Sequence, residues 1–393
     1  MSSLNELKTR VCDLIDSHKA EILEVSHKIH ENPELGLEEF FACGLLCEKL
    51  EENGFSVRKG LAGLETSFRG DYFSGKEGPR IAIIAEYDAL KNLGHGCGHN
   101  IIAAAAIGSA IALKEVMSET GGSLAVMGAP AEETMGGKIN LLDAGEFDDC
   151  DYAMMIHPCP GEGIVGRGGL ACCELTFEYF GRQAHSATEH LGINALTALI
   201  NTFNNIALIR ETFKPGQKLN GIILSGGDAS NIVPGYAKST FCVRANTLTE
   251  LKELNERVIR CAEAAAAGVG ATVKYETGPL FAERYSNRVM DECYLENMKA
   301  IGVPLHFPKP GEMVGSSDIG NVSLKMPTVH EYTSITPEHI AEHTVEFRNA
   351  AVSTLGDEGC INGTKGLAML ALDILCNEAL REKINKEFEE TVK

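Results

Sequence analysis

Three potential metal ligands lie at alternate positions of one glycine-rich segment. His95, Cys97 and His99 are separated by single glycines within residues 94–100. Glycine permits tight turns with positive φ, so neighbouring side chains can converge on one point. Imidazole and thiolate are the usual ligands of zinc and related divalent metals. An isolated Cys-x-His pair is more often a packed or solvated turn, so other parts of the chain must decide between these interpretations.

Two more candidate groups follow short apolar segments. Glu132 and Glu133 come after residues 123–127, and His157 comes directly after residues 152–156. By themselves, adjacent carboxylates usually mean surface charge, and a single histidine is more often a core or capping residue. Together they offer one carboxylate to bind a metal and another to accept a proton from water. Metal-assisted hydrolysis requires both roles, a ligand for the metal and a base for the water.

The elements expected around these residues place them at one edge of a sheet. Residues 81–85, 123–127 and 152–156 are predicted to be buried strands, and residues 101–113 a buried helix. In open α/β sheets, ligands gather beyond the carboxyl ends of the strands. Three successive strands that end in ligand-type side chains therefore predict a single metal site in an α/β fold.

Length and charge limit the class of protein. A chain of 393 residues exceeds what one core usually serves, so two domains are expected. Its net charge of −20 argues against nucleic acid or an anionic membrane as a partner. We see no apolar run of membrane-spanning length and no signal peptide in the first residues. The thirteen cysteines follow no disulfide spacing, which is typical of reduced thiols in the cytoplasm.

The two ends of the chain are predicted to be helical. Residues 4–53 show helical spacing interrupted by a turn at 33–36, which predicts two helices. Glu39 is expected on a solvated face of the second one. Residues 366–388 are amphipathic and are predicted to form one packing helix.

Two loops near the carboxyl end carry further polar side chains. The small polar loop at 315–320 contains Ser317 and could line a cleft. Residues 336–344 add two histidines, His339 and His343. His343 precedes a stretch that is predicted to be helical, so it is expected at a junction between a loop and a helix.

A glycine-rich stretch at 161–169 is predicted to be a linker into a second domain. The segment beyond it has the order β-α-β-β-α-β, which is typical of a ferredoxin-like unit. The expected strands are 170–180, 219–225, 236–245 and 271–276, and the expected helices are 193–213 and 248–267. The chain would then return to the first domain. We therefore expect a discontinuous catalytic domain of residues 1–167 and 284–393, with residues 168–283 inserted as a lid or dimerisation domain.

Three positions of the insertion could contact a substrate. His185 follows a strand, Asn231 ends a polar turn at 226–231, and Arg244 ends another strand. Each also has an ordinary explanation. The turn contains residues that form turns in any protein, and a structural salt bridge is at least as good an explanation for Arg244.

On these residues the chain resembles the dinuclear-metal aminoacylase/carboxypeptidase family of amidohydrolases. It is similar above all to the branch of aminobenzoyl-glutamate hydrolases, plant auxin-conjugate hydrolases and HmrA-type peptidases. The resemblance covers nearly the whole chain and implies a mixed-sheet α/β/α metallopeptidase domain with an inserted ferredoxin-like domain. The most specific matches are Gly-His-Gly-Cys-Gly-His-Asn at 94–100, Pro-Ala-Glu-Glu at 130–133, Gly-Arg-Gln-Ala-His-Ser at 181–186, Asn231 before Val233-Pro234, and His343-Thr-Val-Glu-Phe.

The resemblance implies a dinuclear metal site. Cys97 would bridge two divalent metals, which would be zinc or alternatively manganese or cobalt. Glu132 would be the general base that activates metal-bound water and then protonates the leaving amine. The remaining ligands would be His99, Glu133, His157 and His343.

Further residues are implied around that site. Ser317 would contact the substrate, and Asp88 and Asn100 would support the ligands from behind. Many relatives have aspartate where Asn100 stands. Glu86 occupies the position of a ligating histidine in other branches, and its role stays open. The inserted domain would reach an active site, often that of the neighbouring subunit, to support the oxyanion and the substrate carboxylate through His185, Asn231 and Arg244.

The expected function is metal-dependent hydrolysis of the amide bond in N-acyl or N-aminoacyl amino acids or small dipeptides. The expected assembly is a homodimer or homotetramer formed through the inserted domain. Two other classes stay open: a hydrolase with Cys97 as its nucleophile, and a non-catalytic metal- or metabolite-binding protein. A chelator would inactivate the metal enzyme, whereas alkylation would inactivate the thiol enzyme.

Overall fold

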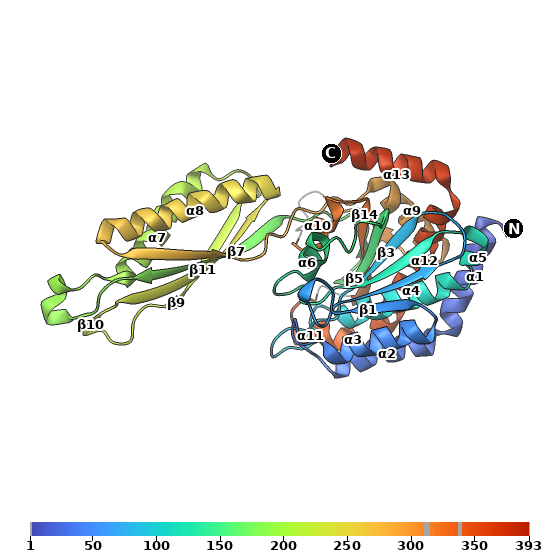
Figure 1. Cartoon of the computed structure of the whole chain (residues 1–393), viewed down its shortest axis with the longest axis horizontal. Coiled ribbons are helices and arrows are strands. Elements are labelled where there is room, and N and C mark those ends of the chain that lie inside the picture. Colours follow the sequence, from blue (N-terminus) through green and yellow to red (C-terminus); the bar gives the residue numbers. More distant parts are fainter. Residues whose placement is uncertain (1, 310–314, 337–339, 393) are drawn as a thin grey trace. The chain divides into compact units, whose positions relative to one another are not determined.

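The computed structural model describes residues 2–309, 315–336 and 340–392. The chain forms two compact units, Met1–Gly168 with Arg284–Lys393, and Gly169–Glu283. Figure 1 colours the chain along its sequence and labels many of the elements used below. His339, one of the two histidines expected before the last helices, lies outside the described residues.

An eight-stranded mixed sheet forms the centre of the first unit. Its order is β1-β2-β4-β3-β5-β14-β6-β13. The central strands β4, β3, β5 and β14 are parallel neighbours, so their carboxyl ends meet at one edge. The strands are β1 (Ser56–Lys59), β2 (Phe68–Phe73), β3 (Arg80–Ala85), β4 (Ser123–Gly128), β5 (Tyr152–Pro160), β6 (Gly163–Ile164), β13 (Leu305–His306) and β14 (Thr328–Thr336).

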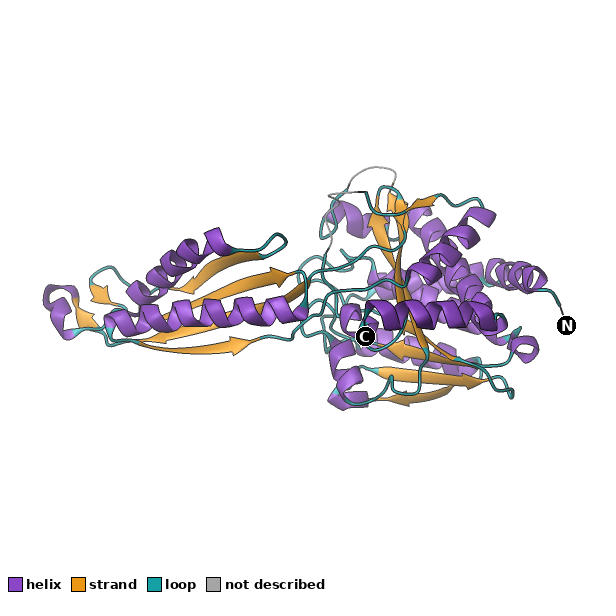
Figure 2. Ribbon diagram, turned by 90° about the horizontal axis from the view of Figure 1, so that it is seen from above, coloured by secondary structure: helices purple, strands orange, loops and turns teal. Residues whose placement is uncertain are grey.

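Helices cover both faces of this sheet because its central strands are apolar on both sides. Along β3, Ile81 and Ile83 belong to one core, and Ala82 and Ile84 belong to another. Figure 2 distinguishes the helical layers from the strands. The expected mixed α/β/α architecture is confirmed. The first core is closed by α1 (Leu4–Ser17), α2 (Lys19–Glu31), α3 (Phe40–Glu52), α4 (His99–Lys114), α9 (Arg288–Ala300), α12 (Thr354–Cys376) and α13 (Glu378–Thr391), and the second by α6 (Gly137–Asp143) and α10 (Ile319–Ser323).

Helix α12 is apolar because it is a core helix. Among the described residues it alone is long and apolar enough to cross a membrane, yet most of that stretch is buried inside the protein. Its glycines allow close packing: a Cβ at Gly363 would lie 3.1 Å from Ile156, and one at Gly366 would lie 2.5 Å from the Tyr294 hydroxyl. The burial of α12 is therefore explained by its neighbours in the first unit.

Three segments differ from their predicted structure. The amino-terminal segment forms three helices rather than two, because α1 ends at Ser17 and α2 begins at Lys19. The single helix predicted at 366–388 is broken at Asn377, whose side chain accepts a hydrogen bond from the Leu380 backbone and caps α13. Part of the predicted linker at 161–169 is strand β6, which pairs with β13 and β14.

The second unit has the expected ferredoxin-like topology. Its four antiparallel strands lie in the order β12-β7-β11-β9, and both helices pack against the central strands β7 and β11. A short antiparallel pair, β8 (Ala184–His185) with β10 (Ile232–Val233), lies outside this sheet. In chain order the main elements are β7 (Ala171–Phe180), α7 (Ala195–Ile209), β9 (Lys218–Ser225), β11 (Tyr236–Ala245), α8 (Leu248–Val269) and β12 (Thr272–Thr277).

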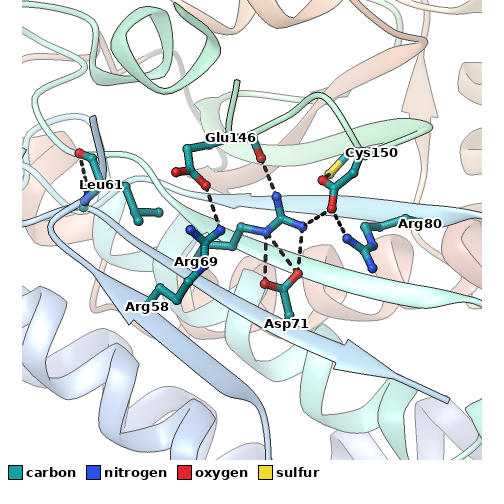
Figure 3. A network of polar contacts seen from close by, with 9 residues as sticks. Arg58, Leu61, Arg69, Asp71, Arg80, Glu146 and Cys150 are labelled. Carbon is teal, nitrogen blue, oxygen red and sulfur yellow. Dashed lines mark hydrogen bonds and ion pairs between the residues drawn. The ribbon is translucent and has the colours of Figure 1, made fainter. Parts of the chain in front are cut away.

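A satisfied charge network joins strands of the first unit to a neighbouring loop (Figure 3). The buried guanidinium of Arg69 on β2 donates to Asp71 at 2.8 Å, to Asp149 at 2.8 Å and to the Glu146 backbone carbonyl at 2.6 Å. Arg80 also pairs with Asp149. Because every edge of the buried guanidinium has an acceptor, this cluster joins β2 and β3 to the loop after α6.

A buried carboxyl pair should make stability depend on pH. Burial raises the pKa of Asp291 from 3.8 to about 7 and holds the pKa of Glu331 well above its ordinary value, with the two groups interacting directly. A raised pKa in the folded state stabilises the protein at low pH, and this stabilisation is lost as pH rises toward 7. We expect the melting temperature of Asp291→Asn to decrease less than that of the wild type between about pH 4 and pH 7.

Thermal unfolding monitored by circular dichroism measures this difference. Glu292→Gln, on the exposed face of the same helix, is the matched control and should keep the wild-type pH dependence. Equal pH dependence in Asp291→Asn and the wild type would contradict the assignment.

Candidate metal centre

The candidate residues come from the carboxyl edge of the central parallel strands. Glu86 and Asp88 follow β3, Glu132 and Glu133 follow β4, and His99 opens α4. The segments after β3 and β4 therefore bring their side chains to the same edge, as parallel strands require. His157 differs from the prediction, because β5 continues to Pro160 and pairs with β14 beyond the histidine.

Cys97, Glu133 and His343 form one group of potential ligands. The Cys97 thiol donates to Glu133 Oε1, and His343 Nε2 lies 3.7 Å from the same oxygen. The backbone N–H of His343 donates to the Gly96 carbonyl at 3.0 Å and its φ is 63°, so a left-handed turn brings the imidazole beside the Gly-Cys segment. One ligand atom from each of these residues lies within 4.8 Å of the others.

His99 is oriented by Asp88. Its Nδ1 lies 2.9 Å from Asp88 Oδ1, and the other oxygen of Asp88 accepts the Glu133 backbone N–H at 3.0 Å. A carboxylate on Nδ1 orients the ring so that Nε2 faces Glu86 and Glu133. Although burial opposes it, Asp88, Glu86 and Glu133 hold the pKa of His99 well above its ordinary value, so a bound metal would replace a proton on Nε2. That Nε2 is buried and has no hydrogen-bond partner among the described residues. This unpartnered nitrogen fits a metal ligand.

His157 is held in a similar way by the backbone. Its Nδ1 donates to the Pro158 carbonyl at 2.6 Å, which leaves Nε2 available. Burial lowers the pKa of His157, so the neutral form that binds metals is favoured. The ring packs edge-on against His99, with ring centres 5.8 Å apart. Ligand atoms of Glu86, His99 and His157 form a second group within 4.8 Å.

Glu132 lies between the two groups. It is 9% exposed, and one of its oxygens lies within 4.8 Å of ligand atoms of His99 and Glu133. Burial raises the pKa of Glu132 well above its ordinary value, and the neighbouring Glu86 and Glu133 raise it further. A carboxyl group with a raised pKa beside potential metal ligands is suited to accept and return a proton.

The turn before Glu132 depends on Glu39, which the sequence placed on a solvated helix face. That placement is wrong, since Glu39 is fully buried. Its Oε1 accepts the Ala131 backbone N–H at 2.8 Å, and Thr66 donates to Oε2 at 2.7 Å. Ala131 has a φ of 58°, a left-handed conformation that alanine rarely adopts. Glu39 therefore holds the turn that carries Glu132 and Glu133.

Lys138 and Asp318 are site residues that sequence reasoning missed. The Lys138 ammonium is fully buried and lies 2.5 Å from both Glu86 Oε1 and Asp318 Oδ1. Asp318 also accepts the Lys138 backbone N–H at 2.9 Å. The signal available was the position of Lys138 directly after Gly136-Gly137 and of Asp318 in the polar loop at 315–320.

The donor set fits divalent cations. The two groups together offer one thiol, three imidazoles and two carboxylates, which are ligands of zinc and manganese. The described contacts of the cluster supply one compensating ammonium, from Lys138. Buried carboxylates in excess of their counter-ions are stabilised by metal binding. The residues expected to bind metal therefore meet in the first unit.

Other residues of the prediction lie elsewhere. Asn100 donates to Ser26 at 2.9 Å and, more weakly, to the Ala351 carbonyl. These contacts join neighbouring helices, and neither of them is with a potential metal ligand. His95 bonds to the Ile29 carbonyl at 3.1 Å. Ser317 is buried and directly precedes Asp318, which pairs with the Lys138 ammonium.

In the second unit, the structure brings two of the three candidates together. His185 pairs with Ile232, and the Asn231 carbonyl accepts the Ser186 backbone N–H at 2.9 Å. Both side chains are exposed. Arg244 lies near the opposite end of β11, about 26 Å along the strand from Tyr236 at its beginning. Within this unit, Arg244 is therefore not grouped with His185 and Asn231.

Residues 165–269 match the family model described as "Peptidase dimerisation domain". The chain is 34% identical to the "Xaa-Arg dipeptidase" of Mus musculus over 98% of this chain and 93% of that protein. It is 25% identical to one of the p-aminobenzoyl-glutamate hydrolase polypeptides of Escherichia coli over 98% of this chain and 96% of that protein.

Two solved structures share the fold. One is a dinuclear metal binding peptidase of the M20 family from Bacillus subtilis, with a TM-score of 0.70 and 20% identity over 92% of this chain and 99% of that chain. The other is a putative aminohydrolase from methicillin-resistant Staphylococcus aureus, with a TM-score of 0.79 and 19% identity over 94% and 100%. At these identities, the structures establish the architecture.

Proposed function

The chain belongs to the M20 family of peptidases and amidohydrolases, and from this premise we propose that it hydrolyses the amide bond of N-acyl amino acids or small dipeptides with two divalent cations. The observation that carries the proposal is the position of Glu132. A buried carboxyl group lies against two groups of potential ligands, where a base is needed for hydrolysis and a protein that only binds metal has no use for it.

The resemblance implies that Cys97 bridges both cations, whereas the ligand atoms of the described residues group Cys97 only with Glu133 and His343. We therefore propose that one cation is held by Cys97, Glu133 and His343, and the other by a group that includes His99 and His157. When bound, such cations polarise the scissile carbonyl and lower the pKa of water. Glu132 accepts the proton of the attacking water and returns it to the nitrogen of the leaving amine. Asp88 orients the His99 ring so that its Nε2 can bind a cation.

Residues of the second unit, with Ser317 of the first, are proposed as substrate contacts. His185 and Asn231 are exposed and adjacent, which is what contact with a substrate oxygen requires. Arg244 stays a proposed partner for a substrate carboxylate, although it lies apart from that pair in its own unit.

The thiol-nucleophile alternative is disfavoured by the surroundings of Cys97. A nucleophilic cysteine needs a lowered pKa and an adjacent base such as histidine. Burial raises the pKa of Cys97, and the neighbouring Glu133 carboxylate, its hydrogen-bond partner, raises it further. A cation bound by Cys97 would reverse this, because a coordinated thiol loses its proton.

A substrate screen with metal-reconstituted protein tests the proposal. Protein stripped by chelator is supplied with Zn²⁺, Mn²⁺ or Co²⁺ and incubated with dipeptides ending in arginine, with p-aminobenzoyl-glutamate and with other N-acyl amino acids. Released amine is the measurement. We expect activity to need added metal and to survive thiol alkylation of the loaded protein. Activity that persists in chelator and fails on alkylation would contradict it.

We also propose that the second unit forms a homodimer or homotetramer. Strand β9 is an outer strand of its sheet and carries three consecutive exposed apolar residues, Ile222, Ile223 and Leu224. An exposed apolar edge strand is a ready surface for pairing with another chain. The match to a peptidase dimerisation domain supports a second copy of this chain as the partner.

Ile223→Lys should therefore convert the assembly to monomer. Lysine on an edge strand opposes pairing because its charge would have to be buried at the interface between the two copies of the chain. Light scattering coupled to gel filtration measures the mass. Phe73→Lys, at an exposed apolar position of the first unit, is the control and should keep the wild-type mass. An unchanged mass for Ile223→Lys would remove β9 from the interface.

A further inference from the structure

The two carboxylate oxygens of Glu86 face different partners. Oε1 lies 2.5 Å from the Lys138 ammonium, and Oε2 lies 3.5 Å from His99 Nε2. Both Oε2 and His99 Nε2 are buried without a hydrogen-bond partner among the described residues. Glu86 is 1% exposed, so bulk water does not reach the second oxygen. A cation held by these two buried atoms would satisfy both of them.

A counter-ion role alone does not account for Glu86. Lys138 already has Asp318 at 2.5 Å, and Asp318 also accepts the Lys138 backbone N–H. One buried ammonium therefore faces two buried carboxylates, Glu86 and Asp318, which leaves an excess negative charge. Burying such a charge is costly unless a further cation compensates it. The unpartnered Oε2 shows on which side that cation would lie, because it points toward His99.

The imidazoles of His99 and His157 both lie close to Glu86. One oxygen of Glu86 and one ring nitrogen each of His99 and His157 lie within 4.8 Å of one another. His99 Nδ1 is engaged by Asp88 and His157 Nδ1 by the Pro158 carbonyl, so both rings have only Nε2 to offer. Two imidazoles and a carboxylate form a donor set for a divalent metal.

We infer that Glu86 is a direct ligand of the cation held by His99 and His157, with Lys138 and Asp318 fixing its other oxygen. The inference rests on the proposed metal-dependent function and adds a sixth protein ligand to it. The two sites are then unlike: one has a thiol, a carboxylate and an imidazole, and the other has two imidazoles and a carboxylate. The thiol site favours zinc, whereas the Glu86 site also suits manganese.

Cobalt binding tests the inference without an activity assay. Full-length wild type, Glu86→Gln and Asp318→Asn are stripped of metal and titrated with Co²⁺, and visible absorption and bound metal are measured. The wild type should bind two equivalents. Glu86→Gln should bind one equivalent normally and the other more than about 100-fold more weakly, since even outer partners of ligands contribute about 10–100-fold. The sulfur-to-cobalt absorption of the Cys97 site should be retained.

Asp318→Asn is the matched control because it removes the other carboxylate from Lys138 and leaves Glu86, His99 and His157 in place. It should reduce affinity less than Glu86→Gln does. Equal losses in the two variants, or a Glu86→Gln variant that binds two equivalents with the wild-type spectrum, would overturn the inference. A wild type that binds no Co²⁺ would instead overturn the proposed function.

Glu86→Asp distinguishes the loss of a ligand from misfolding. It keeps a negative charge beside Lys138 but shortens the side chain by one methylene, so it should fold and still lose affinity at the second site. Circular dichroism of the metal-free proteins checks the fold. Wild-type affinity in a folded Glu86→Asp variant would count against direct ligation.

Discussion

Glu132→Gln is expected to fold and keep its metal while its turnover decreases by about 10²–10⁴-fold, the usual contribution of a general base. Glutamine has nearly the shape of glutamate but cannot accept the proton of water. The change should not destabilise the fold, because burial, Glu86 and Glu133 already make the charge of Glu132 costly. Turnover, metal content and melting temperature are measured on the same preparation.

Glu133→Gln is the matched control for this result. It makes the same chemical change one residue further on, where the side chain contacts Cys97 and lies 3.7 Å from His343. We expect it to lose metal as well as activity. Retained turnover in Glu132→Gln would remove that residue from the mechanism, and loss of metal in both variants would show that the adjacent carboxylates share one role.

The convergence of the candidate ligands was largely predictable because several of them follow parallel strands. Apolar segments before Glu86 and Glu132 indicated two strands, and parallel neighbours must end at the same edge. The side chains that follow these two strands could therefore be expected to lie close together without knowledge of contacts between distant segments. The ferredoxin-like unit was predictable for a similar reason, since its order of strands and helices is local to one stretch of 115 residues, Gly169–Glu283.

The residues that were missed depend on contacts between distant segments. In the sequence, Lys138 resembles a surface lysine in the first turn of a short helix. Its partner Asp318 lies 180 positions further along the chain. Glu39 likewise lies 92 positions from the Ala131 backbone that it holds. Charge type and periodicity do not encode such pairings, so a buried charge looks like a solvated one in the sequence.

Local capping explains the remaining differences in the fold. The periodicity of 366–388 is continuous, but α12 ends before Asn377, whose side chain caps the next helix. Periodicity reports which face is buried and says little about where a helix ends. The same limit applies to His157, because an apolar run of five residues gave no sign that β5 continues beyond it.

Cys97→Ser is expected to lose one of the two cations. A serine hydroxyl is smaller than a thiol and is not ionised near neutral pH, whereas a coordinated cysteine binds as the thiolate. Glu133 and His343 would be left as the only other members of that group, and His343 is half-exposed, so two ligands would have to hold the cation against water. Metal content after gel filtration should decrease from two equivalents to about one.

Cys360→Ser separates this effect from the general cost of a polar group in a core. Cys360 is fully buried in α12, outside the metal centre, so its serine variant should be less stable yet keep both equivalents. Cys97→Ser should also lose the sulfur-to-cobalt absorption, which Cys360→Ser keeps. Unchanged metal content in Cys97→Ser would mean that the thiol only packs against Glu133. The gap between Glu133 and His343 would then need a different ligand, and the thiol, carboxylate and imidazole site proposed above would be wrong.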